Sequence, residues 1–141
     1  MTKREQILQA IVAALAATGA KVIRNAEVPT TVSAGGLIIV RDGDPGEPEI
    51  TLSPLAYTFN HVVDVEAYAQ AQAKMTRTAT LDDLVAAIGT ALAADRTFGG
   101  LTEFATPRGV TVTEQGQAGA ASVAAAVIPL AVIYTTTDPL S

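Results

Sequence analysis

The chain has 141 residues, a net charge of −5 and no cysteine. This length predicts one domain, spanning residues 1–141, with a single hydrophobic core. The sequence pI near 4.7 argues against a dedicated nucleic-acid-binding protein, which normally carries a basic patch. The absence of cysteine excludes disulfides, thiolate nucleophiles and the usual zinc sites.

Charged residues make up only 16% of the chain, and its mean hydropathy is positive, at +0.34. Soluble domains usually have about 25% charged residues. Such a domain either covers part of its surface by self-association or reflects an alanine-rich composition, and composition leaves both explanations open. The longest apolar run, residues 123–134, is too short to span a membrane, and no secretory cleavage pattern follows the N-terminus.

The first predicted element is a helix that begins at a capping box, Thr2-Lys3-Arg4-Glu5. An apolar stripe at helical spacing follows, and Gly19 is a plausible C-terminal cap. The stripe consists of Ile7, Leu8, Ile11, Val12 and Leu15. Two short strands are predicted next, over residues 21–24 and 37–40, and β-branched residues favour strand over helix in the second.

A long strand is predicted from Tyr57, because apolar and polar residues alternate through residue 67. This alternation is typical of an antiparallel strand with one face on the core and the other in water, with Val62 and Tyr68 as exceptions. Residues 70–78 are predicted to form a loop or a frayed strand end. A second capping signal, residues 80–83, indicates a second helix. Its apolar stripe is Leu81, Leu84, Val85, Ile88 and Leu92.

The last third of the chain predicts two further strands. Residues 110–113 alternate as a strand, and the Gly-rich residues 115–119 predict a turn or a mobile tip. Three consecutive alanines favour a helix within residues 122–136, whereas Pro129 and the β-branched residues favour an extended chain. We predict a strand, with Pro129 at a bulge or at an edge position that lacks a ladder partner.

The predicted element order is therefore α-β-β-β-α-β-β. Two helices on one face of a mostly antiparallel sheet, an α+β fold, is the natural packing for this order.

His61 is the only histidine, and it shares a strand face with Phe59 and Val63. One interpretation is a general base or a metal ligand. The favoured one is a partly buried histidine with one hydrogen-bonded nitrogen, because local spacing places no carboxylate beside it and no G-x-S-x-G motif is present. We therefore expect no enzymatic activity, no catalytic residue and no cofactor.

Residues 41–54 form an acidic segment rich in proline and glycine, R-D-G-D-P-G-E-P-E-I-T-L-S-P. Its four carboxylates, of Asp42, Asp44, Glu47 and Glu49, resemble calcium ligands. Counted from Asp42, however, Gly46 stands fifth and Glu47 sixth, whereas the calcium-binding loop of a helix-loop-helix needs an oxygen ligand fifth and a glycine sixth. We expect no metal site. The prolines stiffen the segment, which predicts a projecting loop that contacts partners and contributes little to the fold.

The chain resembles the tail-terminator (tail-completion) proteins of long-tailed bacteriophages and related prophages. The likeness spans nearly the whole chain in length and element order, and its motifs are structural. It rests on a capped N-terminal helix followed by Val22-Ile23-Arg24-Asn25, residues 36–49, Leu52-Ser53-Pro54, residues 94–101 and Asp138-Pro139-Leu140.

The resemblance implies an α/β protein that forms a hexameric ring, caps the finished tail tube, stops its polymerisation and presents the surface that joins the head. The implied partners are copies of the chain itself, the tail-tube protein and a head-tail connector protein, while DNA passes through the ring without specific binding. The implied location is the host cytoplasm during assembly and then the virion tail. Acidity suits a DNA channel because carboxylates repel phosphates, although ordinary solubility explains it equally well.

A ring requires one surface of a subunit to meet a different surface of its neighbour. We expect the interface residues in the acidic loop and in the turn after the second helix. They are Arg41, Asp42, Asp44, Glu47, Glu49, Arg96 and Phe98. Two alternatives stay open: another head-tail connector or completion ring protein, and a small enzyme that uses His61.

Overall fold

The computed structural model describes residues 1–29, 31–115 and 122–141. Its elements are α1 (Lys3–Leu15), the 3-10 turn η1 (Ala16–Thr18), β1 (Lys21–Arg24), β2 (Leu37–Arg41), β3 (Glu49–Leu52), β4 (Leu55–Gln70), α2 (Lys74–Ala93), β5 (Phe104–Pro107), β6 (Thr111–Gln115) and β7 (Val123–Thr136). The predicted α+β order is confirmed, with the short strands β3 and β5 added to it.

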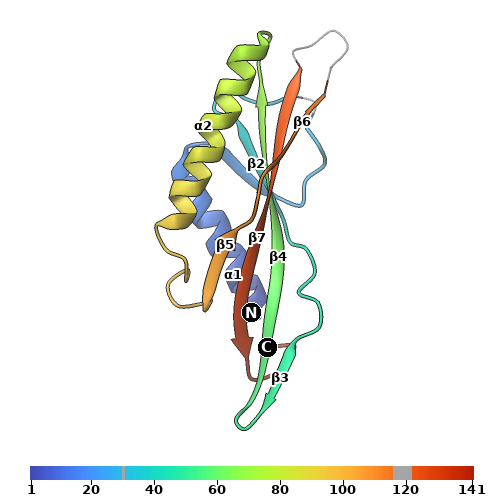
Figure 1. Ribbon diagram of the computed structural model, residues 1–141, viewed down its shortest axis with the longest axis vertical. Helices are drawn as coiled ribbons and strands as arrows, with labels where there is room; N and C mark the ends of the chain where they lie inside the picture. The colour runs from blue at the N-terminus through green and yellow to red at the C-terminus, as the bar shows by residue number, and fades with distance from the viewer. Residues whose placement is uncertain (30, 116–121) are drawn as a thin grey trace.

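The sheet is built around one long antiparallel pair, β4 and β7. These strands stay in register from Tyr57 opposite Thr136 to Gln70 opposite Val123. The hairpin strand β3 covers one end of β4, and β2 covers the other, with β1 parallel to it beyond. On the far side of β7, β5 and β6 lie one after the other. The β3 hairpin and β6 are therefore at opposite ends of the molecule (Figure 1).

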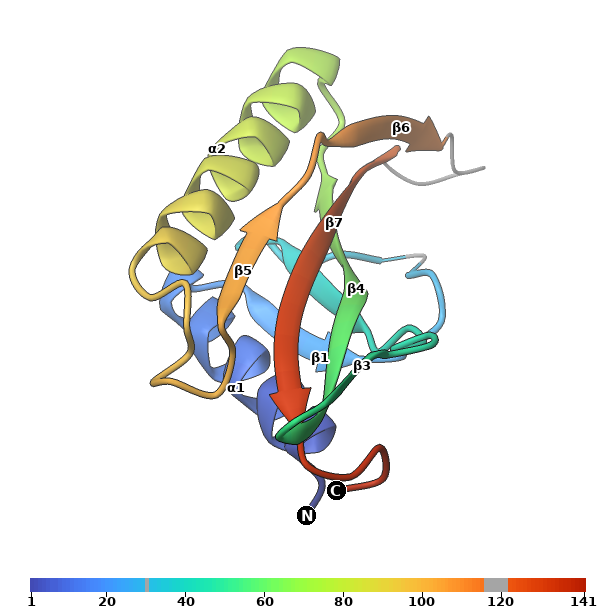
Figure 2. The ribbon, with the colours of Figure 1, turned by 60° about the horizontal axis from the view of Figure 1, so that its bottom comes forward.

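Both helices pack on the same face of the sheet, as predicted (Figure 2). Their apolar stripes join the odd-numbered residues of β4 and the even-numbered residues of β7 in one core. Val12 and Val85 lie at the margins of the stripes and are half-buried. The buried stripe residues are Ile7, Leu8, Ile11 and Leu15 of α1 and Leu81, Leu84, Ile88 and Leu92 of α2.

The opposite face of the sheet has a smaller apolar cluster. The connection between β1 and β2 covers part of this face, and Val32 of that connection packs there. Tyr68, an exception to the predicted alternation, is buried in this cluster with Leu37, Ile39 and Val123. The sheet therefore has a dry helix-covered face and a second face that is only partly covered.

The two predicted helix starts have different outcomes. At α1 the Thr2 hydroxyl accepts a hydrogen bond from the Glu5 amide at 3.2 Å, and Gly19 takes a left-handed conformation at the end of η1, as predicted. The second capping signal was wrong, because α2 begins at Lys74 and residues 80–83 lie within it. The early start is stabilised by Arg77, which is buried, donates to the Ala71 carbonyl and pairs with Glu114 of β6. These tertiary contacts override the low helix propensity of the threonine-rich stretch.

Residues 122–136 were predicted as a strand, and β7 confirms this. Pro129 lies opposite Asp64 without a break in register, so the predicted bulge is wrong. Its carbonyl accepts from the Arg108 amide at 2.7 Å, between the end of β5 and the start of β6. The predicted edge position is also wrong, because β7 lies between β4 and β5 and Pro129 pairs with Asp64. The proline is tolerated because its missing N–H faces the gap between two outer strands. Most of the predicted tip, residues 116–119, lies outside the described residues.

Candidate assembly surfaces

The first part of the acidic loop belongs to the fold. Arg24 of β1 binds two carboxylates at once, Glu5 of α1 at 2.7 Å and Asp42 at 2.7 Å. It is bidentate to each of them. The cluster ties the start of α1 to the end of β2. The expectation that the loop contributes little to the fold is therefore wrong at Asp42.

The cluster also changes the titration of its carboxyl groups. Hydrogen bonds from Arg24 are the main reason that the pKa values of Glu5 and Asp42 are lowered. The same hydrogen bonds raise the pKa of Arg24. All three groups are therefore charged at neutral pH.

Arg41 also makes its contacts within the chain. Its guanidinium forms an ion pair with Glu66 of β4 at 3.2 Å and donates to the Ala26 carbonyl. The Tyr68 hydroxyl donates to the same glutamate at 2.7 Å. Burial, and to a smaller extent this hydrogen bond, raises the pKa of Tyr68 to about 12. Arg41 therefore orders the partly covered face of the sheet, which is a structural role that its predicted interface role did not include.

The second part of the loop points outward. The Asp44 carboxylate accepts from the Gly46 amide at 2.8 Å in a local turn. Glu47 and Glu49 are exposed, and Glu49 opens β3. Of the predicted acidic interface residues, Asp44, Glu47 and Glu49 are thus placed at the surface.

The loop leads into a projecting hairpin, formed by β3 and the first residues of β4, that extends beyond the rest of the sheet (Figure 1). All four residues of β3 are exposed, and Leu52 is 81% exposed. Ile50 lies opposite Tyr57 and Leu52 opposite Leu55, so these apolar side chains share the face that the helices cover elsewhere. We call Ile50, Leu52 and Leu55 the hairpin patch. Sequence reasoning did not identify it.

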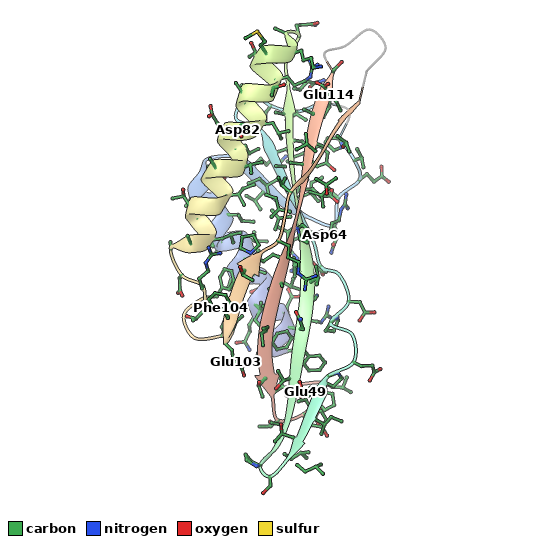
Figure 3. All side chains as sticks on the ribbon, in the orientation of Figure 1. Glu49, Asp64, Asp82, Glu103, Phe104 and Glu114 are labelled. Carbon is green, nitrogen blue, oxygen red and sulfur yellow. The ribbon has the colours of Figure 1, made fainter. Side chains whose placement is uncertain are left out.

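A second apolar surface lies at the other end, between α2 and β6. A groove of about 300 Å³ there is lined by Lys74, Thr78 and Leu81 of α2 and by Val112 of β6, among others. Figure 3 shows Asp82 on α2 and Glu114 on β6 at this end of the molecule. Val112 is 61% exposed and Met75 is 86% exposed. Val110 and Val112 also line an adjoining hollow with Thr78 and Asp82, and these two α2 residues line a third hollow with Met75. We call Met75, Val110 and Val112 the groove patch. It also went unpredicted.

The turn after α2 is held mainly by Asp95. Its carboxylate accepts from the amides of Thr97 and Gly99, at 2.9 and 2.7 Å. These hydrogen bonds lower the pKa of Asp95, and the one from the Thr97 amide has the largest effect. The expectation that Phe98 lies at an interface is not supported by its position, because its side chain is 9% exposed and packs in the core. Arg96 is half-buried, and its Nη1 atom has no hydrogen-bond partner among the described residues.

His61 lies inside the fold. It is 1% exposed, and its Nε2 atom lies 2.6 Å from the Asp42 carbonyl oxygen. A carbonyl only accepts, so Nε2 carries the proton. Burial is the main reason that the pKa of His61 is lowered, which leaves the ring neutral at pH 7. The favoured interpretation, a partly buried histidine with one hydrogen-bonded nitrogen, is confirmed for the hydrogen bond, and the side chain is more deeply buried than expected.

The described ranges, 1–29, 31–115 and 122–141, lack two further features. No three His, Cys, Asp or Glu side chains converge there in an arrangement that could hold a metal ion. No helix in these ranges is both long and apolar enough to cross a membrane.

Comparison with known proteins adds no family assignment. No protein-family model matches the chain, and no curated protein matches it.

Proposed function

We propose that this chain is a structural assembly protein of the tail-terminator type, which closes into a ring on the end of a tail tube and presents the surface that joins the head. The observation that carries the proposal is the pair of uncovered apolar surfaces, the hairpin patch and the groove patch. The sequence resemblance supplies the type of assembly. The low content of charged residues supports a domain that covers part of its surface in an assembly.

Two different surfaces suit a ring better than a two-fold dimer. In a cyclic ring each subunit offers one surface to one neighbour and a different surface to the other. The two patches lie at opposite ends of the β4–β7 pair, on different elements, and they expose different side chains (Figure 1). Each patch has only three large apolar residues, so the contact between free subunits is expected to be weak.

A weak contact suits a terminator. Subunits that stay monomeric or loosely associated in solution are available until the tube reaches its length. The end of the tube then adds contacts and raises the local concentration of subunits, which closes the ring. The hairpin patch and the exposed Glu47 and Glu49 are the part of the chain that we assign to contact with a neighbour or with the tube.

Two alternative functions remain, another connector ring and a small enzyme, and the buried position of His61 disfavours the second. Another head-tail connector ring would use the same two patches. An enzyme that uses His61 is disfavoured, because the imidazole of His61 is buried and its protonated nitrogen donates to a backbone carbonyl.

The first experiment measures the mass of the native protein with and without tail-tube protein. Leu52→Glu and Val112→Glu each place a charge in one patch and should abolish the ring on the tube. Thr51→Glu and Thr111→Glu are matched controls, because both threonines are exposed neighbours on the opposite face of the same strands. The controls should still form the ring. Equal ring formation by all four variants would exclude the two patches from the contact.

The second experiment tests the biological role by assembling tails without this protein. We expect overlong tails that fail to join heads. Tails of normal length that still join heads would contradict the terminator function.

A further inference from the structure

The hairpin patch and the groove patch differ in shape. The hairpin is convex, because it extends beyond the rest of the sheet (Figure 1). The groove patch borders two hollows between α2 and β6, of about 300 Å³ and about 130 Å³. Two copies that met hairpin to hairpin, or groove to groove, would leave most of this apolar surface in water. The hairpin of one copy set into the groove of another would bury both surfaces with close packing.

The sizes of the two surfaces also agree. A water occupies about 30 Å³ in the liquid, so the larger hollow has room for about ten heavy atoms. This is enough for two leucine side chains, and Leu52 and Leu55 lie side by side at the hairpin. The walls of the hollows supply apolar atoms from Leu81, Val85 and Val112. The hairpin patch therefore fits the groove in volume and in polarity.

The charges beside the two surfaces favour the same pairing. Glu49 is exposed next to the hairpin patch and forms no ion pair within the described ranges (Figure 3). Of the two charged residues that line the larger hollow, Glu114 is paired with Arg77, whereas Lys74 is exposed and has no ion pair among the described residues. Asp82, in the smaller hollow, has the opposite charge and reduces the attraction. The free cation of the larger hollow therefore suits an acidic occupant.

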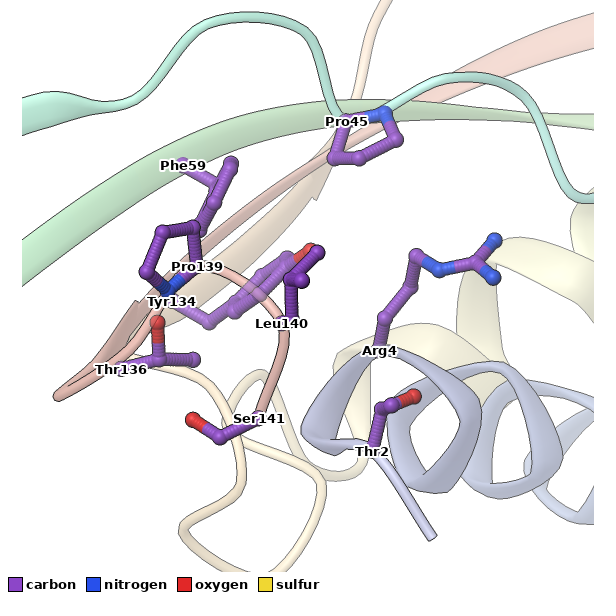
Figure 4. A pocket seen from close by; sticks show the side chains of 9 residues that line it. All are labelled: Thr2, Arg4, Pro45, Phe59, Tyr134, Thr136, Pro139, Leu140 and Ser141. Atoms are coloured by element: carbon purple, nitrogen blue, oxygen red, sulfur yellow. The ribbon is translucent and has the colours of Figure 1, made fainter.

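Both surfaces are held in place by contacts within the chain. Where the hairpin leaves the rest of the sheet, the rings of Phe59 and Tyr134 are stacked with centroids 5.3 Å apart. Figure 4 shows the two rings with Pro139 of the C-terminal segment close to them. The groove is fixed by Arg77, which joins the first turns of α2 to Glu114 of β6. Surfaces that are ordered before they meet lose less conformational entropy on binding, which favours association through them.

We propose that the hairpin patch of one copy docks in the groove patch of a second copy. Leu52 and Leu55 of the first copy fill the larger hollow of the second, and Glu49 lies beside Lys74 at the border of the contact. Every copy uses its hairpin toward one neighbour and its groove toward the other, so the contact is head to tail. This inference rests on the proposed function, because it specifies which surfaces adjacent subunits of the proposed ring bring together.

The test is chemical cross-linking of full-length variants. The chain has no cysteine, so one introduced thiol is a unique label. Leu52→Cys and Val112→Cys are made as separate proteins, and both positions are more than half exposed, so the fold should be preserved. A short bismaleimide reacts irreversibly, so it traps a weak contact, and it spans more than the roughly 7 Å between Cα atoms that a disulfide allows. The mixture should give a cross-linked dimer, whereas each variant alone should stay monomeric.

Two controls accompany the mixture. Thr51→Cys mixed with Thr111→Cys places the thiols on the opposite face of the same strands, and this pair should give much less dimer. Lys74→Glu, added to the Val112→Cys protein, should lower the yield about two- to fivefold, the effect of one exposed ion pair. Lys21→Glu, which changes an exposed cation on β1, should leave the yield unchanged.

Four results would each overturn the proposal. They are no dimer from the mixture with or without tail-tube protein, a dimer from Leu52→Cys alone, equal yields from the leucine–valine and threonine pairs, and equal yields from the two lysine variants. A dimer from Leu52→Cys alone would indicate a two-fold contact. The readout is independent of tail length. Overlong tails without the protein, together with no cross-link, would retain the proposed function and exclude this contact, and a cross-link with tails of normal length would do the reverse.

Discussion

Gly43 is the position where one added methyl group should distinguish the packed part of the acidic loop from its free part. Its φ is +66°, and a Cβ atom there would lie 2.5 Å from the Val62 carbonyl oxygen and 3.5 Å from His61 Nε2. Gly46, three residues later, has nearly the same φ of +69°, but a Cβ atom there would have no neighbour within 4 Å. The two glycines therefore share the conformational cost of an alanine and differ only in the clash.

The magnitude follows from that difference. Alanine in the left-handed region costs roughly 1–2 kcal/mol at either site. At Gly43 the clash is with the backbone of β4, which is paired with β7 throughout this region and cannot easily shift. Relief must come from movement of the loop, which strains the fit and weakens the bond between His61 and the Asp42 carbonyl. Overpacking of this kind costs roughly 1–3 kcal/mol more.

The assay is urea unfolding of Gly43→Ala and Gly46→Ala beside the wild type. We expect Gly43→Ala to lose about 2–5 kcal/mol and Gly46→Ala to lose about 1–2 kcal/mol. Equal losses, within about 0.5 kcal/mol, would refute the packing of this loop on β4, because strain alone would then account for both variants.

Three further predictions concern the core, the Arg24 cluster and pH. Ile11→Ala, at a fully buried position, should lower the free energy of unfolding by about 2–5 kcal/mol in denaturant melts. Met75→Ala, at an exposed position, should change it by no more than about 0.5 kcal/mol. Similar losses in the two variants would mean that the buried face is wrongly assigned. A double-mutant cycle of Arg24→Met and Asp42→Asn should give a coupling of about 0.5–1 kcal/mol, since both side chains are about a quarter exposed, and no coupling would show that the pair is fully screened. The folded pKa of His61 lies below its unfolded value of 6.5, so the unfolded state binds the extra proton as the pH falls. The free energy of unfolding should therefore decrease below about pH 6.5, by at most ~1.4 kcal/mol per pH unit. This pH range lies above the one in which the carboxyl groups of Glu5, Asp42 and Asp95, whose pKa values are lowered, become protonated. The charges of Arg4, Asp42 and Asp44 act on the same ring. Melts from pH 7.5 to 5.5 should therefore show a slope that His61→Gln lacks, and equal slopes would contradict this assignment.

Local patterns were sufficient for most of the fold. The stripes from Ile7 to Leu15 and from Leu81 to Leu92 repeat at the helical period, and the alternation along β4 repeats at the strand period, so each pattern specifies both an element and its buried face. The start of α2 did not follow from local signals, because Arg77 meets Glu114 across 37 residues of sequence. A short-range capping motif cannot anticipate such a contact.

The candidate surfaces were harder to predict for a related reason. Ile50 and Leu52 have the composition of an ordinary buried strand, and only the position of β3 beyond the other strands exposes them. Asp42 was assigned with the outward acidic residues, yet its partner Arg24 stands 18 residues earlier. Charge and hydropathy describe the side chains of a segment. Whether those side chains are exposed depends on which distant segment packs against them.

Pro129 has a consequence for how the protein behaves in solution at high concentration. Because Pro129 offers no N–H at the gap between β5 and β6, a single uninterrupted outer strand could not hydrogen-bond along the whole of β7. The outer border of the sheet is instead divided into strands of four and five residues. A long uninterrupted border would be a template on which strands of other molecules could add without limit, as in amyloid. The proline thus protects the longest strand pair of the molecule from uncontrolled aggregation, while each short border strand remains available for a specific contact.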